Sequence, residues 1–571
     1  MSTLDWIIVV LTLSFVVLYG VYKSRTSKNL DGYFLGNRSM PWWLVLLSIM
    51  GTQASAITFL SGPGQAYADG MRFVQYYLGL PLAMVVICVS FVPLFNKLKV
   101  YTAYQFLEER FDARTRTFTA CLFLLQRGLS TGISIYAPSI ILSSLFGWDI
   151  VWTNIVMGGL LIIYTTTGGA KAVAYTQQLQ LVIIFTAMAL AGYFAVKLLP
   201  DGVGFIDALH IGGQMGKLNI ITTDTQENGF DWNDRYNIWS GVIGGFFLAL
   251  SYFGTDQSQV GRYLTAQNNR ESRLGLIMNG FVKIPMQFLI LLIGVLIFSF
   301  YQFTAAPLSF NDALVDKTAN VNRESVAQLQ TTLQQLQHQR QQAVQQLVQQ
   351  HPGERTSAAD TLRQINSRIA GVRNQFRTLA AENGLGDGND TNYVFLSFVK
   401  QYLPAGLKGL LIAIIFLAAW GSIAAALNSL AASTVVDFHC RRWPIKNEAA
   451  EYTISQVYTV GWGLFSILVA QFAHGLGQSL IEAVNVLGSL FYGVILGIFL
   501  LAFYFKKVSG PSVFMAAVAV QLFVLVLFFN ERIPVFSFLP DVSFLWMNVV
   551  GALGVVGLGC VLSAGKNISH S

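Results

Sequence analysis

Long apolar stretches separated by short polar connections occupy most of this chain of 571 residues. A run of about 20 apolar residues is long enough to cross a bilayer as one helix. We therefore predict an all-α polytopic membrane protein with about thirteen transmembrane helices, at residues 4–22, 41–68, 73–95, 116–146, 150–167, 174–199, 237–259, 275–303, 405–437, 453–474, 480–505, 511–530 and 543–563.

Residues 304–392 interrupt this pattern because they are polar. Within them, residues 325–350 carry apolar side chains at helical spacing in a Gln-rich background, namely Leu329, Leu333, Leu336, Val344, Leu347 and Val348. A second helix-like stretch, 358–381, follows the helix-breaking residues His351, Pro352 and Gly353. We expect an external helical hairpin, with a disordered Gln-rich tract as the alternative. Its role is open between docking of a protein partner at 319–383, a lid over the outer vestibule, and decoration.

The composition supports a membrane protein, since 54% of the residues are hydrophobic and only 11% are charged. Soluble domains carry roughly 25% charged residues. The net charge of +7 does not require a nucleic-acid partner, because Lys and Arg crowd the short connections between spans. The four cysteines show neither disulfide nor metal-ligand spacing; they are Cys88, Cys121, Cys440 and Cys560. The first span is too long for a signal peptide, so we expect it to be retained.

The distribution of basic residues predicts the orientation, because cytoplasmic loops are enriched in Lys and Arg. The connections on one side carry Lys23, Arg25, Lys28, Arg38, Lys97, Lys99, Arg110, Arg114, Arg116, Lys171, Arg262, Arg270, Arg273, Arg441, Arg442, Lys446, Lys506, Lys507 and Lys566. The short loops on the other side carry only Arg72, Lys217, Arg235 and Arg532. We expect a multi-pass protein of the plasma or inner membrane, with its N-terminus outside and its C-terminus in the cytoplasm.

The second span is interrupted in its middle by Gly51, Thr52, Gln53, Ser55 and Thr58. Such a helix is expected to be broken, and a break frees backbone carbonyls at membrane depth. Transporters use discontinuous helices of this kind to bind substrate and ions, although a Gly-softened kink is the alternative.

The seventh span repeats the pattern with Ser251, Gly254, Thr255, Asp256 and Gln257 near its inner end, where Asp256 is also compatible with the membrane interface. These two spans hold positions one and six of a ten-helix set. Corresponding breaks in two halves are typical of an inverted repeat.

The span at 411–438 places small residues on one helical stripe and brings hydroxyl groups to membrane depth, including those of Ser422, Ser429 and Ser433. Small residues let neighbouring helices approach closely, which favours a packing role. Hydroxyls and carbonyls are also the ligands of hard cations, so an ion site is the alternative.

Two cationic side chains fall within predicted spans, namely Arg127 and Lys283. Lys283 fits either snorkelling to the inner surface or a cavity, while an arginine facing lipid is too costly. No phosphate-binding loop, metal-ligand cluster or nucleophile–base pair is evident, so we do not expect an enzyme.

The chain resembles the sodium/solute symporter family, which includes bacterial galactose, proline and sialic acid transporters and animal glucose, multivitamin, monocarboxylate and iodide transporters. The similar stretches are DGYFLGNRSMPWW (31–43), VYTAYQFLEERFD (100–112), IYAPSIIL (135–142), YTTTGGAKAVAYTQQLQ (164–180), TDQSQVGRYL (255–264), NYVFLSFVKQYLPAGLKGLLIA (392–413) and ALNSLAASTVVDF (426–438). Their order and spacing carry the resemblance along nearly the whole chain except 304–392.

The resemblance implies a leucine-transporter-like fold, which consists of two inverted repeats of five helices together with additional flanking helices. It divides the chain into an extra N-terminal helix (4–22), core helices one to seven (41–303), the external loop (304–392), core helices eight to ten (393–505) and two C-terminal helices (511–563). It also implies alternating access, with a sodium gradient that drives import of a small organic solute.

The family holds a sodium ion between the first and eighth core helices. The resemblance transfers this site to the carbonyls of Gly51, Ala54 and Ala418 and to the hydroxyl of Ser422. This chain has Gly421 where relatives often have a second hydroxyl.

The fifth core helix departs from the family as well. It reads Tyr175-Thr176-Gln177 where many relatives have a carboxylate that contributes to an additional sodium site, so one sodium ion per cycle is expected.

The resemblance also places the substrate site beside the break in the second span. The candidate residues are Gln53, Ser55, Thr58, Tyr77, Arg127, Tyr252, Lys283 and Asn485. Thr58 and Tyr77 differ from the residues that grip a hexose, whereas Lys283 and Arg127 suit an organic acid or a sugar acid. Proton coupling and a non-transporting solute sensor are the alternative functions.

Overall fold

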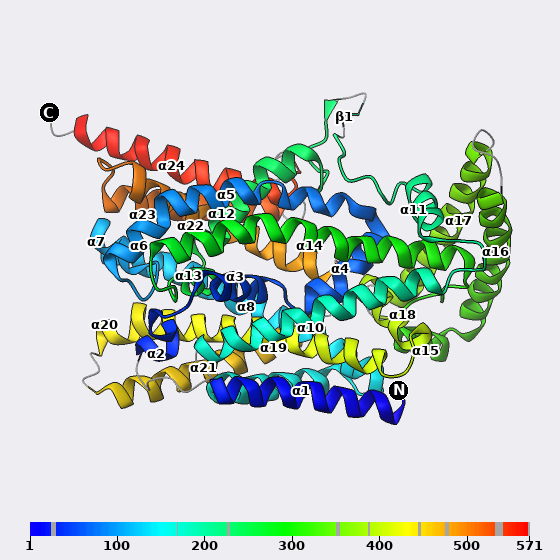
Figure 1. Ribbon diagram of the computed structural model, residues 1–571. Helices are drawn as coiled ribbons and strands as arrows, with labels where there is room; N and C mark the ends of the chain where they lie inside the picture. Colours follow the sequence, from blue (N-terminus) through cyan, green and yellow to red (C-terminus); the bar gives the residue numbers. More distant parts are fainter. Residues whose placement is uncertain are drawn as a thin grey trace.

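Nearly parallel helices form one bundle, and a pair of long helices covers one of its ends (Figure 1). The computed structural model describes residues 1–23, 30–167, 170–223, 225–226, 229–349, 355–385, 389–443, 447–473, 479–530 and 541–568. The N-terminus lies at the end covered by the helix pair, and the C-terminus lies at the opposite end (Figure 1). The helix breakers at 351–353 and the basic residues Arg25, Lys28, Lys446 and Arg532 lie outside the described residues.

The helices that run along the bundle include the predicted spans. They are α1 (Thr3–Lys23), α3 (Trp42–Gln53), α4 (Ala56–Asp69), α5 (Leu80–Val86), η3 (Ile87–Phe91), α6 (Val92–Leu98), α8 (Ala113–Phe146), α9 (Ile150–Thr167), α10 (Ala170–Lys197), η4 (Ser240–Gly244), α12 (Gly245–Thr255), α13 (Gln257–Tyr263), α14 (Asn269–Phe303), α19 (Leu407–Ser433), η6 (Thr434–His439), α21 (Glu448–Ala470), α22 (Leu480–Tyr504), α23 (Gly510–Phe528) and α24 (Phe544–Ile568).

Shorter elements connect these helices at the two ends of the bundle, together with the helix pair. They are α2 (Leu30–Leu35), η1 (Gly36–Arg38), η2 (Gly70–Tyr77), α7 (Gln105–Arg110), α11 (Phe205–Gln214), the strands β1 (Thr225–Gln226) and β2 (Gly229–Phe230), α15 (Asp312–Val321), α16 (Arg323–Gln349), α17 (Arg355–Glu382), η5 (Thr391–Tyr393), α18 (Val394–Tyr402) and α20 (Cys440–Arg442).

Helix length and hydropathy agree with a polytopic membrane protein. Within the described ranges, nine helical segments are long and apolar enough to cross a membrane, and four shorter apolar helices accompany them. The shorter ones include α3 and η4–α12, each of which forms part of an interrupted helix.

Both predicted interruptions are present. The second span consists of two helices: α3 ends at Gln53 and α4 begins at Ala56. Between them, Ser55 is in an extended conformation (φ −80°, ψ 174°). The seventh span breaks at Asp256, which is also extended (φ −75°, ψ 119°) and whose side chain caps α13 by accepting a bond from the Ser258 N–H. Asp256 is 1% exposed, so it lies inside the bundle. Each break leaves main-chain groups and polar side chains inside the bundle.

Helix α19 lies at the centre of the bundle, where it packs against α1, α3, α8, α9, α10 and α21. Its small residues permit this close packing, as expected for apolar helices that associate in lipid. The hydroxyls of Ser422 and Ser429 donate to carbonyls one turn earlier, at Ala418 and Ala425. The small-residue stripe therefore serves helix packing, while Ser422 differs from Ser429 in that it also lines the central cavity.

The polar segment between α14 and η5 is a helical hairpin made by α16 and α17, as predicted, and the disordered alternative is wrong for its described residues. The two helices bury their own apolar cluster, which includes Leu336, Val344, Leu362 and Phe376. Hairpin side chains also donate to carbonyls at the end of α14 and just beyond it: Gln341 to Phe303 and Gln337 to Ala306. The hairpin is thus fixed to the bundle as well as to itself.

Candidate functional site

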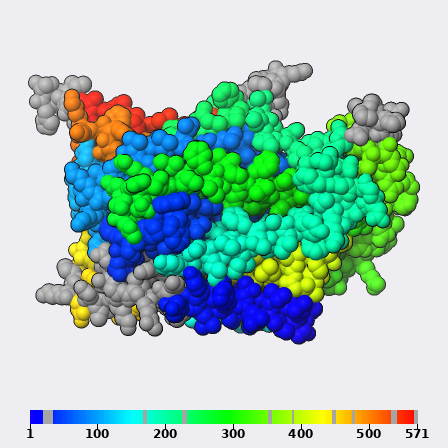
Figure 2. All heavy atoms as spheres, in the orientation of Figure 1, coloured from blue at the N-terminus to red at the C-terminus, as the bar shows by residue number. Residues whose placement is uncertain are grey.

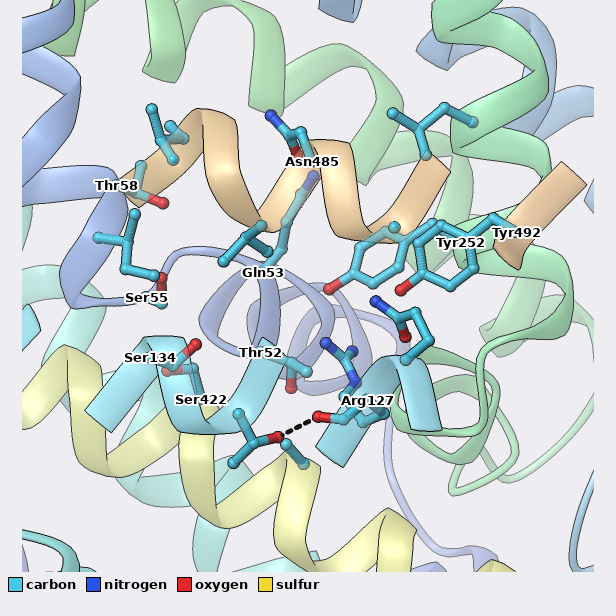
Figure 3. A pocket seen from close by; sticks show the side chains of 18 of the residues that line it. Thr52, Gln53, Ser55, Thr58, Arg127, Ser134, Tyr252, Ser422, Asn485 and Tyr492 are labelled. Atoms are coloured by element: carbon cyan, nitrogen blue, oxygen red, sulfur yellow. Dashed lines mark hydrogen bonds between the residues drawn. The ribbon is translucent and has the colours of Figure 1, made fainter. Parts of the chain in front are cut away.

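A cavity of about 100 Å³ lies beside the first break, at the meeting point of α3, α4, α8, α12, α19 and α22. Its polar lining comes from Thr52, Gln53, Ser55, Thr58, Tyr76, Tyr77, Gln126, Arg127, Thr131, Ser134, Tyr252, Ser422, Asn485 and Tyr492. In Figure 3 the labelled side chains of the broken helix and of α22 face those of α8 and α19 across this space. An enclosed space with a few convergent polar groups is typical of a small-molecule site.

Seven of the eight predicted substrate residues line this cavity: Gln53, Ser55, Thr58, Tyr77, Arg127, Tyr252 and Asn485. The breaks account for this convergence, since Gln53 and Ser55 flank one of them and Tyr252 precedes the other by one turn. Gln126, Ser134 and Tyr492 also line the cavity and were not predicted. Helical spacing along α8, with one step of four residues from Arg127 to Thr131 and two such steps from Gln126 to Ser134, would have indicated this polar face.

Lys283 is the exception, because it is not among the lining residues. It is fully buried (0% exposed), and its ammonium lies 5.5 Å from the ring centroid of Tyr77. Tyr77 lines the cavity, so its ring lies between Lys283 and this space. Snorkelling to the membrane surface is excluded by its burial.

Arg127 is held by an acidic and aromatic cluster beside the second break. Its guanidinium Nη2 lies 3.3 Å from Asp256, and it also contacts the hydroxyl of Ser258. Tyr492 donates its hydroxyl to the same carboxylate at 2.7 Å. The guanidinium lies 5.5 Å from the ring centroid of Tyr252, in reach of a cation–π interaction. The break at Asp256 therefore positions a carboxylate that compensates the buried arginine.

One edge of this guanidinium remains unused by the protein. In the part of the chain that the structure describes, Nε of Arg127 is buried and has no hydrogen-bond partner. An unsatisfied buried donor costs free energy, so it marks a position where a ligand oxygen stabilises the site.

The predicted sodium residues lie where α3, α10 and α19 meet. Ser422 lines the cavity, and its hydroxyl donates to the Ala418 carbonyl at 2.9 Å, so both predicted α19 ligands share one helical turn. Gly51 and Ala54 lie at the end of α3, where Ala54 occupies its C-cap position. The geometry brings neutral oxygens of the kind that hard cations prefer to one region of the bundle.

Two glutamines of α10 fill the space around this region. Gln177 accepts a bond from Ser48 at 3.0 Å and donates to the Gly421 carbonyl at 3.1 Å, so it bridges α3 and α19. A methyl group at Gly51 would lie 2.8 Å from the Gln177 side chain. A Cβ at Gly421 would lie 2.6 Å from Oε1 of Gln180. Gly51 is therefore required by close packing against Gln177, whereas at Gly421 the oxygen of the Gln180 side chain lies where the absent side chain of residue 421 would begin.

The profile of the sodium:solute symporter family matches residues 33–334 and 377–519. The chain belongs to the sodium:solute symporter family. This symporter is 24% identical over 562 residues to the sodium/sialic acid symporter NanT of Aliivibrio fischeri, a match that covers 98% of the chain and 92% of that protein. It is 32% identical over 257 residues to the human sodium/iodide cotransporter, a match that covers 44% of the chain and 38% of that protein.

The symporter's fold matches the solved substrate-bound, outward-open structure of a Na⁺-coupled sialic acid symporter. The TM-score is 0.74 at 23% identity, over 99% of this chain and 98% of the other. The predicted leucine-transporter-like fold is thereby confirmed. The symporter is a multi-pass membrane protein that couples sodium movement to the transport of a small organic solute, with Na⁺ as its coupling ion.

Proposed function

We propose that this symporter imports a small organic anion, either a sugar acid or another carboxylic acid, by alternating access. The observation that carries the proposal is Arg127, whose guanidinium borders the central cavity with a buried Nε free of protein partners in the described residues. A carboxylate is the natural acceptor for such a donor, because charge-assisted bonds are shorter and stronger than neutral ones. Relatives of the chain include proteins named for sialic acid, iodide and monocarboxylates, all of which are anions.

The roles of the remaining lining residues follow from their chemistry. Gln53, Ser55, Thr58 and Asn485 offer hydrogen bonds to the hydroxyl groups of a solute, while Tyr77 and Tyr252 provide aromatic walls. Lys283 acts through Tyr77, since its charge lies behind that ring.

The proposed sodium ligands are the carbonyls of Gly51, Ala54 and Ala418 with the hydroxyl of Ser422. Because Ser422 lines the cavity, sodium binding there orders the wall that the solute contacts. Ion and solute binding are coupled through this shared wall.

We propose that one sodium ion accompanies each anion. Gln177 stands in the helix α10 position where a carboxylate would be needed to hold a second ion, and its amide is already occupied by Thr52 and Gly421. A monocarboxylate and one sodium ion carry no net charge together, so their uptake is electroneutral. The protein is proposed to lie in the plasma or inner membrane with its N-terminus and the hairpin outside.

Uptake into proteoliposomes tests this function. We expect radiolabelled carboxylates from a panel of sugar acids and monocarboxylates to accumulate when sodium, but not potassium, is outside. A potassium-diffusion potential is expected to leave the initial rate unchanged for a monocarboxylate. Uptake of neutral sugars alone would exclude the anion, and a rate that rises with the inside-negative potential would exclude the one-to-one stoichiometry.

A further inference from the structure

A second cavity of about 460 Å³ lies under the hairpin, at the opposite end of α4 from the break. Its walls are the outer end of α4, the outer end of α14, the segment after α11, and the helices α16 and α17. In Figure 1 these elements meet at the end of the bundle that carries the N-terminus. Figure 2 shows the hairpin covering this end as a continuous surface with the bundle. The hairpin thus encloses a space that the bundle alone does not form.

The charges around this space are unbalanced. Five cationic side chains line it: Lys217, Arg340, Arg363, Arg373 and Arg377. Among the described lining residues, Asp390 is the only acidic one. Its carboxylate is already engaged by Arg377 at 3.2 Å and by the Phe310 N–H at 2.7 Å. Just outside the lining, Asp360 pairs with Arg363 at 2.7 Å, and the charge of Asp69 acts on Lys217. The excess of positive charge in the cavity is therefore carried by Arg340 and Arg373.

Two of the arginines are held rigidly but incompletely satisfied. Arg340 is 2% exposed and donates through Nη2 to the Thr304 carbonyl at 3.2 Å. Arg373 donates through Nη2 to the Pro307 carbonyl at 2.7 Å. For both side chains Nε is buried without a hydrogen-bond partner in the described part of the protein. Backbone carbonyls orient these guanidiniums but do not neutralise them, which leaves their charge available to an anion.

The buried cations carry an electrostatic cost. Burial lowers the pKa of Arg340 to about 10, and the neighbouring Arg373 lowers it in the same direction while Tyr67 opposes it. Burial also lowers the pKa of Lys217, against the opposing charge of Asp69. With a pKa of about 10, Arg340 stays protonated at neutral pH. An anion placed among these groups would remove part of the cost of gathering them.

Aromatic rings complete the lining and favour an organic ligand over a bare inorganic ion. Tyr67, Phe298 and Phe310 face the space, and Arg373 lies 4.9 Å from the ring centroid of Phe310. Tyr67 belongs to α4, the same helix that presents Thr58 to the central cavity. Helix α4 therefore contributes side chains to both cavities.

We propose that this outer cavity is a binding site for small organic carboxylates, built mainly by the hairpin. The family profile does not match residues 335–376, which contain Arg340, Arg363 and Arg373. The site is therefore an addition to the shared transporter fold. The ligand of this site is the transported solute, which is captured here before it enters the central cavity. This assignment rests on the proposed function. Clustered positive charge raises the local concentration of an anionic solute and its rate of association.

The test measures thermal stability of the full-length protein at fixed ionic strength against lactate, malonate and glucuronate, with glucose as the neutral comparison. The parent protein and an R127M/D256N variant, in which the central guanidinium is removed, are both expected to be stabilised by at least one carboxylate. R340Q/R373Q is expected to weaken that binding at least tenfold. R323Q/R368Q is the matched control, since Arg323 and Arg368 lie on the same two helices and do not line the cavity.

A half-buried member of the cluster provides a milder variant if R340Q/R373Q folds poorly. Lys217→Gln is expected to weaken carboxylate binding roughly threefold while leaving the hairpin intact. Equal stabilisation by chloride, equal binding in R340Q/R373Q, or no response to any of the three carboxylates would overturn the site. The proposed transport function is tested by uptake, whereas the outer site is tested by carboxylate binding to R127M/D256N. Failure of one proposal can therefore be distinguished from failure of the other.

Discussion

The central and outer cavities use the same side chain, arginine, under opposite electrostatic conditions. In the central cavity Arg127 is paired with Asp256, which also accepts a bond from Tyr492. In the outer cavity Arg340 and Arg373 are oriented by backbone carbonyls and share their surroundings with further cations. A paired guanidinium is retained in a dry site at low cost, whereas a group of unpaired ones requires a counter-ion.

This difference indicates a division of roles under the proposals above: the central cavity selects the solute, and the outer cavity captures it. At the proposed central site the compensated arginine offers only its Nε to a carboxylate, so recognition of the anion there is expected to depend on geometry. At the proposed outer site the uncompensated arginines attract carboxylates by charge, so binding there is expected to weaken as the salt concentration rises.

The largest effect is expected when the ion pair of Arg127 and Asp256 in the central cavity is disrupted, first by replacing Arg127 alone and then by replacing both residues. Arg127→Met leaves Asp256 buried without its cation, and we expect a loss of stability of about 3–5 kcal/mol together with loss of uptake. R127M/D256N is expected to recover the stability but not the uptake. Thermal unfolding and sodium-driven uptake of both variants distinguish the two effects; normal uptake by the double variant would remove Arg127 from the binding site.

The sodium ligand on α19 offers the next largest effect. Sodium at a hundredfold excess over its Kd is expected to stabilise the protein by roughly 2.7 kcal/mol, and potassium is not. Ser422→Ala is expected to abolish most of this difference. Ser429→Ala is the control, because Ser429 makes the same helical hydrogen bond two turns later but does not line the cavity. An equal loss in both variants would indicate a packing effect instead of an ion site.

Restoring the absent hydroxyl tests whether glutamine packing has replaced it. Gly421→Ser is expected to weaken sodium binding instead of strengthening it, since its Cβ would lie 2.6 Å from Oε1 of Gln180. G421S/Q180A relieves this contact, and we expect it to bind sodium more tightly than G421S. Sodium titrations followed by thermal stability compare the two. If G421S alone bound sodium more tightly than the parent protein, the Gln180 side chain would be shown to move aside without weakening the site.

The smallest expected effect is a pH dependence confined to the outer cavity. Because burial lowers the pKa of Lys217, its charge is present at low pH and is lost, as pH rises, earlier than that of an exposed lysine. Carboxylate binding by R127M/D256N is therefore expected to fall roughly threefold as pH rises through the pKa of Lys217. Lys217→Arg keeps its charge over this range and is expected to reduce the fall to the part that comes from Arg340, whose pKa is about 10. A pH profile that is identical in both would assign the effect elsewhere.

The sequence predicted local features of the fold better than it predicted pairings between helices. Interruptions at Ser55 and Asp256 were predictable because polar residues and glycine within an apolar span are costly in lipid unless the helix breaks there or lines a cavity. The helical hairpin was predictable from apolar spacing alone.

Features that depend on distant residues were not predictable in this way. Arg127 and Asp256 are 129 positions apart, and only the tertiary fold brings the side chain from α8 to the carboxylate at the second break. Lys283 lies behind Tyr77 because of the way α14 packs against η2, which no pattern within α14 reveals. The outer cavity combines residues from α4, α14 and the hairpin, so its charge excess is visible only in three dimensions.

The attachment of the hairpin to the end of α14 has a consequence for what the hairpin requires of the bundle. Gln337, Arg340 and Gln341 reach the bundle by donating to main-chain carbonyls of residues 303–306. Main-chain acceptors exist whatever side chains a host sequence carries, so these three anchors demand no matching substitutions from the transporter that receives the hairpin. These anchors therefore depend on the path of the main chain at the end of α14 and not on the side chains there.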